Sequence, residues 1–128
     1  MNTTAIKTLF TAALLGTLIA IPLPEADAKK GGPTVVVFNA SWCASCRNVV
    51  PIAQNVASQN NMGVEVIDVD AQDAPAKASG YGLSIPKNEP PQVYFVNGGK
   101  VTLLFDGREY KYGQDDAVRG AILNRLKQ

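Results

Sequence analysis

After residue 33 the hydrophobic positions along the chain follow two different patterns. Residues 34–39 (TVVVFN) form a continuous apolar, β-branched run without alternation, which is typical of a central strand buried on both faces. Over residues 43–58 the apolar side chains instead recur at helical spacing, at Val49, Ile52, Ala53 and Val56. This spacing places them on one face, so it predicts an amphipathic helix soon after the strand.

The rest of the chain continues the alternation of strands and helices. Strands are predicted at 64–69, 92–96 and 100–105, helices at 71–80 and 115–127, and a loop rich in glycine and proline at 81–91. Asn97-Gly98-Gly99 tolerates positive φ, which indicates a hairpin between the last two strands. The order β-α-β-α-β-β-α predicts one α/β domain, in which a mixed four-stranded sheet has flanking helices on both faces.

Residues 1–28 have the pattern of a secretory signal peptide. Lys7 gives a basic start, residues 8–23 are almost wholly apolar, and Ala26-Asp27-Ala28 forms a small-x-small cleavage site. A retained membrane anchor is the alternative, but the apolar run is short for the core of a bilayer. We therefore expect residues 29–128 to be released as one domain, without stable membrane insertion. The expected compartment is a periplasm or an equivalent lumen, with secretion as the alternative.

Composition changes this picture mainly by what it excludes. The 12 Lys and Arg residues are scattered and balanced by 11 Asp and Glu residues, so no nucleic-acid surface is indicated. The chain has no His, which removes Cys–His and Ser–His dyads and most zinc and haem sites. It has two Cys residues, so a four-thiolate zinc site is excluded as well.

The two cysteines, Cys43 and Cys46, lie where the first strand gives way to the first helix. Free backbone N–H groups and the positive end of the helix dipole favour an anion there, so Cys43 is predicted to be an exposed nucleophilic thiolate at the start of the helix. Cys46 lies one turn deeper and is placed to resolve a mixed disulfide. Because a lone C-x-x-C is a weak motif, an inert bridge, a non-catalytic binding module and a metal-binding pair remain open. Trp42 is predicted to shape a docking surface rather than the core.

Several segments, which together cover nearly all of residues 29–128, resemble the thioredoxins. They are residues 35–46 (VVVFNASWCASC), Pro51, residues 64–70, residues 81–83 (YGL), and residues 91–95 (PQVYF) with the turn at 97–99. The resemblance implies a thioredoxin-like fold and a thiol–disulfide oxidoreductase that acts on protein thiols and disulfides through a redox-active Cys43–Cys46 disulfide. It implies no cofactor and no metal, and it implies a substrate groove formed by Trp42, Ala44, Ser45, Pro90 and Pro91. We expect a monomer.

The chain also departs from the thioredoxin pattern between and around the cysteines. The usual Gly-Pro between the two thiols is Ala44-Ser45 here, so the resemblance does not carry over a redox potential. Val37 and Val66 stand where thioredoxins have a buried acid and its lysine partner. The proton route that assists the second cysteine is therefore expected to be missing or different.

A second departure concerns the proline that faces the cysteines, because the segment 81–91 is several residues longer than the family pattern. Two residues compete for the role of the cis-proline, Pro86 and Pro91. Pro91 is followed at once by the strand 92–96, whereas choosing Pro86 would put further prolines into a strand that must pair on both sides. The register therefore predicts a cis bond before Pro91.

Overall fold

The computed structural model describes residues 32–128; the predicted signal peptide and the predicted mature start at Lys29 lie outside this part of the chain. The elements in chain order are β1 (Thr34–Asn39), α3 (Cys46–Gln59), β2 (Gly63–Asp68), α4 (Ala74–Gly80), β3 (Gln92–Asn97), β4 (Lys100–Asp106), the short 3₁₀ helix η1 (Gly107–Glu109) and α5 (Asp115–Leu126). The predicted order of strands and helices is confirmed, and η1 is an addition to it.

The four strands form one mixed sheet in the order β2-β1-β3-β4. β1 pairs with β2 in parallel and with β3 in the antiparallel sense, and β3 and β4 form an antiparallel hairpin. β1 therefore lies inside the sheet, and its five residues from Thr34 to Phe38 are buried. The prediction of a central strand from an apolar run without alternation is confirmed.

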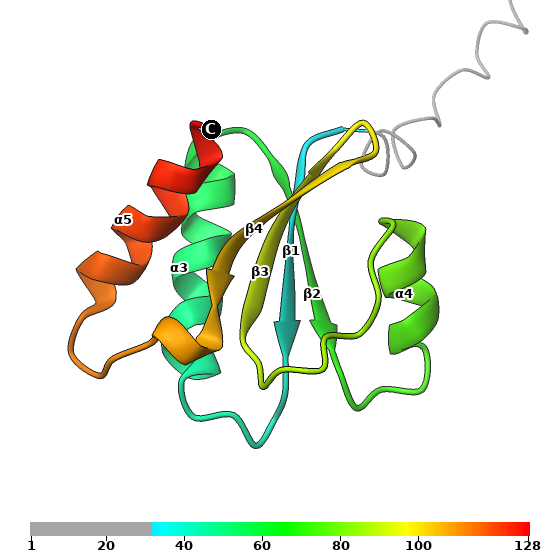
Figure 1. Cartoon of the computed structure of the whole chain (residues 1–128), viewed down its shortest axis with the longest axis horizontal. Helices are drawn as coiled ribbons and strands as arrows, with labels where there is room; N and C mark the ends of the chain where they lie inside the picture. The colour runs from blue at the N-terminus through cyan, green and yellow to red at the C-terminus, as the bar shows by residue number, and fades with distance from the viewer. Residues whose placement is uncertain (1–31) are drawn as a thin grey trace, which may run out of the picture.

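Helices cover both faces of the sheet, as Figure 1 shows with α3 and α5 on one side and α4 on the other. The larger core joins Val35 and Val37 of β1 to apolar residues of α3, β4 and α5. The smaller core joins Val36 and Phe38 to α4 through Ala74 and other apolar residues. Successive residues of β1 thus serve opposite faces, as the pleat requires. Among residues 32–128 no helix is long and apolar enough to cross a membrane.

The β3–β4 hairpin has a tight turn at one end and one shift in its pairing register near the other. Its turn is the predicted one, since Gly98 and Gly99 have φ values of 56° and 87° and connect the paired residues Asn97 and Lys100. Further along, the register shifts by one residue between Val93 and Tyr94. This β-bulge changes which residues of β3 and β4 face each other at the end nearest the cysteines.

Candidate active site

The cysteine pair lies in the turn between β1 and α3. Cys43 and Cys46 are joined by a disulfide, and their Cα atoms are 5.4 Å apart. Together with Ala40 they form a small buried cluster of their own, against which Val50 and Val69 pack. The disulfide lines a pocket of about 370 Å³ that Arg47 also borders. The structure thus brings the two predicted redox residues together at a concave part of the surface.

Two predictions about Cys43 are wrong in detail. The residue precedes the helix, because Cys43 N–H donates to Ala40 O at 3.1 Å and the first helical residue is Cys46. It is also not exposed: Cys43 is 6% exposed and Cys46 2%, since the neighbouring loop covers the first sulfur. The helix terminus still reaches the sulfur, because the N–H of Cys46 donates to Cys43 Sγ at 3.2 Å. An N–H donor at this place favours the thiolate when the disulfide is reduced.

The loop that covers Cys43 ends in two prolines. The Pro90–Pro91 peptide bond is cis, and it is the only cis bond in residues 32–128, so the choice of Pro91 over Pro86 is confirmed. Pro90 O lies 3.3 Å from Cys43 Sγ. In the disulfide this sulfur has no hydrogen, so the contact is not a hydrogen bond; in the reduced state a thiol could donate to the carbonyl.

Trp42 lies beside the same loop, directly before Cys43 in the chain. It is 60% exposed, and its indole N–H donates to Asp70 Oδ2 at 2.8 Å. Trp42, Asp70, Pro86 and Pro90 line a second pocket, of about 270 Å³. The exposure agrees with a surface role for Trp42. Its partner Asp70 lies in the turn after β2, and sequence reasoning did not assign it to the site.

The other predicted groove residues have less contact with these pockets. Ala44 is exposed and Ser45 half-buried in the turn between the cysteines, with Ser45 Oγ 3.6 Å from Cys43 Sγ. Pro91 is buried and does not line either pocket. Of the predicted groove residues, Trp42 and Pro90 therefore line one of these two pockets, and Ala44, Ser45 and Pro91 do not.

Val37 and Val66 are neighbours across β1 and β2, as the comparison with thioredoxins implied. Val37 is fully buried in the larger core, and Val66 packs against the same cluster. No carboxyl group or lysine occupies these two positions. Within residues 32–128 there is no group of three or more His, Cys, Asp or Glu side chains that could hold a metal ion.

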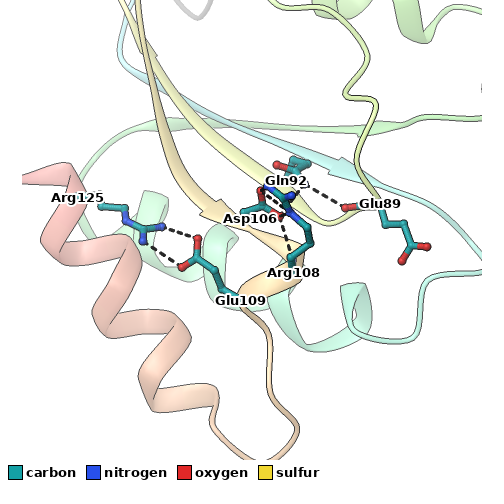
Figure 2. Close-up of polar contacts among 6 residues, drawn as sticks. All are labelled: Glu89, Gln92, Asp106, Arg108, Glu109 and Arg125. Carbon is teal, nitrogen blue, oxygen red and sulfur yellow. Dashed lines mark hydrogen bonds and ion pairs between the residues drawn. The ribbon is translucent and has the colours of Figure 1, made fainter.

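A polar cluster that sequence reasoning missed lies at the end of the β3–β4 hairpin (Figure 2). Gln92 and Asp106 are 2% and 6% exposed, and they face each other across the two strands. Arg108 donates three side-chain hydrogen bonds to the Asp106 carboxylate. Chiefly because of these bonds, the pKa of Asp106 is lowered to about 2, so the carboxylate is charged throughout the neutral range. The one signal in the sequence was a polar residue at the end of each of two apolar strands.

Comparison with known proteins agrees with this arrangement. The sequence model of the thioredoxin family matches residues 25–117. The chain belongs to the thioredoxin family. Its four-stranded mixed sheet with helices on both faces is the thioredoxin fold, and the cysteine pair occupies the turn after a central strand.

Individual relatives are similar over part of their length. Thioredoxin 1 of Nostoc sp. is 33% identical over 72 residues, which are 56% of this chain and 64% of that protein. The protein disulfide-isomerase erp38 of Neurospora crassa is 29% identical over 108 residues, 77% of this chain and 25% of that protein. The structure of Fasciola hepatica thioredoxin has 28% identity and a TM-score of 0.47, covering 89% of this chain and 93% of that one. The match with Thioredoxin 1 thus spans less than two thirds of that relative.

Proposed function

We propose that this chain is a thiol–disulfide oxidoreductase that exchanges disulfides with protein substrates through Cys43 and Cys46. The observation that carries the proposal is the disulfide itself, which lies in a surface pocket with the first N–H of α3 directed at Cys43 Sγ. Membership of the thioredoxin family supports it, since thioredoxins and disulfide isomerases are among the relatives.

The proposed reaction has two steps. The reduced chain attacks a substrate disulfide with the Cys43 thiolate, so that a Cys43–substrate disulfide forms and one substrate sulfur leaves and takes up a proton. Cys46 then loses its proton and attacks Cys43 Sγ, which restores the Cys43–Cys46 disulfide and releases the second substrate thiol. The substrate gains two electrons and the chain loses two. In the reverse direction the same steps oxidise a substrate dithiol.

The assignment of roles follows from the position of each sulfur. Cys43 Sγ accepts a hydrogen bond from the N–H of Cys46 and lies beside Pro90, which lines a surface pocket together with Trp42. Cys46 is the more deeply buried of the two and is held in the first turn of α3. A substrate sulfur can therefore approach Cys43, while Cys46 is positioned for attack only within the chain.

Trapping of mixed disulfides tests this assignment. We expect Cys46→Ser to accumulate covalent, reductant-sensitive adducts with protein substrates on Cys43, because the resolving thiol is gone. Cys43→Ser is the matched control, and it should accumulate few or none. Non-reducing gels and mass spectrometry of the adducts measure both variants. Equal trapping by the two variants would contradict the proposed division of roles.

The compartment is part of the same proposal. We propose that the protein works outside the cytoplasm, in a periplasm or an equivalent lumen, and this is supported by the signal-peptide pattern of residues 1–28. An oxidising compartment suits a chain that exchanges disulfides with folding or damaged proteins.

A further inference from the structure

The hydrogen-bond cluster at the end of the β3–β4 hairpin reaches the loop beside the cysteines. Gln92 Nε2 donates to Asp106 Oδ1 at 3.2 Å and to Glu89 O at 3.1 Å (Figure 2). Both partners are acceptors, so the amide of Gln92 has one orientation that satisfies them. A single buried side chain thereby connects strand β4 with the backbone of the 81–91 loop.

The carboxylate at the centre of the cluster is held firmly. Arg108 donates to it from its backbone N–H at 2.9 Å, from Nε at 3.1 and 3.2 Å, and from Nη2 at 2.7 Å. Buried charged groups persist where such bonds compensate for lost hydration. Asp106 therefore stays ionised and accepts hydrogen bonds throughout the neutral range. The amide group of Gln92 is thereby directed toward Glu89 as well.

The connected loop segment is the one that contacts the reactive sulfur. Glu89 is followed by Pro90, whose carbonyl oxygen lies 3.3 Å from Cys43 Sγ. Gly107, the first residue of η1, approaches Pro91 so closely that a Cβ atom on Gly107 would lie 2.8 Å from Pro91 Cδ. The loop is thus held at Glu89 by a hydrogen bond and at Pro91 by direct packing, with the Pro90 carbonyl between them.

We propose that Gln92 and Asp106 are positioning residues for Cys43: they hold the Pro90 carbonyl oxygen beside the sulfur and so restrain formation of the thiolate. The inference rests on the proposed function, in which Cys43 is the nucleophile. A carbonyl oxygen can only accept, so it stabilises a thiol that donates to it and repels a thiolate. It therefore opposes the N–H of Cys46, which favours the thiolate. The balance of these two contacts sets how much of Cys43 is reactive at a given pH.

Other charged groups also lie on the segments around Cys43. They are Arg47 on α3, Asp70 after β2, and Lys87 and Glu89 on the loop. The variants below leave all four unchanged, so that a change in the alkylation rate of Cys43 reports on the position of the loop.

The test measures the rate at which iodoacetamide alkylates Cys43 in the full chain, as a function of pH. A Cys46→Ser background leaves Cys43 as the one thiol, because the sequence has two cysteines. Gln92→Leu removes both amide donors and keeps a buried side chain of similar size. At a pH below the thiol pKa we expect alkylation about three- to tenfold faster than in the parent, the effect of losing one hydrogen bond to the thiol.

Glu109→Gln is the matched control. Glu109 accepts two hydrogen bonds from Arg125 on the other side of the same segment, and this pair does not reach the loop (Figure 2). The control should lose a little stability and leave the alkylation profile unchanged. Arg108→Met is a second test variant: it removes the side-chain donors to Asp106, should lower the stability, and should accelerate alkylation in the same direction as Gln92→Leu.

Faster alkylation in either test variant, with the control unchanged, supports the inference. The inference is overturned if neither variant alters the profile, or if Glu109→Gln alters it as much as they do. Alkylation needs no protein substrate, so this result is independent of the proposed function. If the unmodified chain fails to exchange disulfides with any protein, the proposed function fails whatever the alkylation rates show.

Discussion

Replacing Gly107 by alanine would place a methyl group against the proline that precedes β3. An ideal Cβ atom at Gly107 would lie 2.8 Å from Pro91 Cδ and 2.9 Å from both Pro91 N and Pro91 O. Carbon atoms do not approach so closely, and two of these three neighbours are backbone atoms that cannot rotate away. The backbone of Gly107 is not in the left-handed region, so the effect of the methyl group is steric.

The expected loss of stability is about 1–3 kcal/mol, which is the usual cost of overpacking a well-filled site. For a domain of this size that loss corresponds to a fall in Tm of roughly 4–8 °C for each kcal/mol. Gly120→Ala, in the middle of α5, is the matched control, because a Cβ atom there meets nothing within 4 Å. It should raise the stability by about 0.5–1 kcal/mol, since alanine favours a helix interior.

Urea denaturation of the oxidised full chain, followed by circular dichroism, measures both variants. The two substitutions are chemically identical and should change the free energy of unfolding in opposite directions. If Gly107→Ala is as stable as the unmodified protein while Gly120→Ala gains stability, the close contact between Gly107 and Pro91 does not exist, and the support of the loop by Gly107 must be abandoned.

Two further predictions concern the charge on Asp106 and the start of the exported protein. The pKa of Asp106 is lowered to about 2, against about 4 in the unfolded chain, so the charged carboxylate stabilises the fold at pH 5 and above. This stabilisation is lost as the pH falls through 2, and Asp106→Asn should lack the dependence. The difference in unfolding free energy between the unmodified chain and Asp106→Asn should shrink by about 1–2 kcal/mol from pH 5 to pH 2, allowing for the exposure of Arg108. A difference that stays constant with pH would refute the ionic role. Intact-mass analysis of the exported protein should find Lys29 as its first residue; a chain that retains residues 1–28 in membranes would refute the signal-peptide interpretation.

Much of the fold could be predicted from the sequence because it depends on local patterns. The apolar run of β1 predicts a strand that pairs on both sides, and the structure shows that pairing. The two glycines of the hairpin turn have the positive φ values that such a turn requires. The choice of Pro91 followed from its place directly before β3, since a strand that pairs on both sides excludes prolines.

The polar cluster beside the cysteines could not be predicted, because it depends on the β-bulge. With a two-residue turn and regular pairing, Gln92 would face Phe105. The register shift between Val93 and Tyr94 moves Asp106 opposite Gln92 instead. Nothing in the local sequence marks this shift, which the structure accommodates by burying both Leu104 and Phe105.

The surroundings of Cys43 were also beyond local reasoning. The helix pattern gave the apolar face of α3 correctly, but it could not show that the residues before Cys46 form turns, in which N–H groups bond to carbonyls three residues back. The burial of Cys43 comes from Pro90, which is distant in sequence. Contacts of this kind are determined by tertiary packing and not by the spacing of residues.

The measurement that tests the central claim most directly is catalysed reduction of a protein disulfide. The full chain, kept reduced with dithiothreitol, is mixed with insulin, and the loss of the insulin disulfides is followed over time. The proposed function predicts a rate well above that of dithiothreitol alone, which Cys43→Ser abolishes. A rate no faster than dithiothreitol alone, or an equal acceleration by Cys43→Ser, would contradict the claim that the Cys43–Cys46 pair exchanges disulfides with proteins.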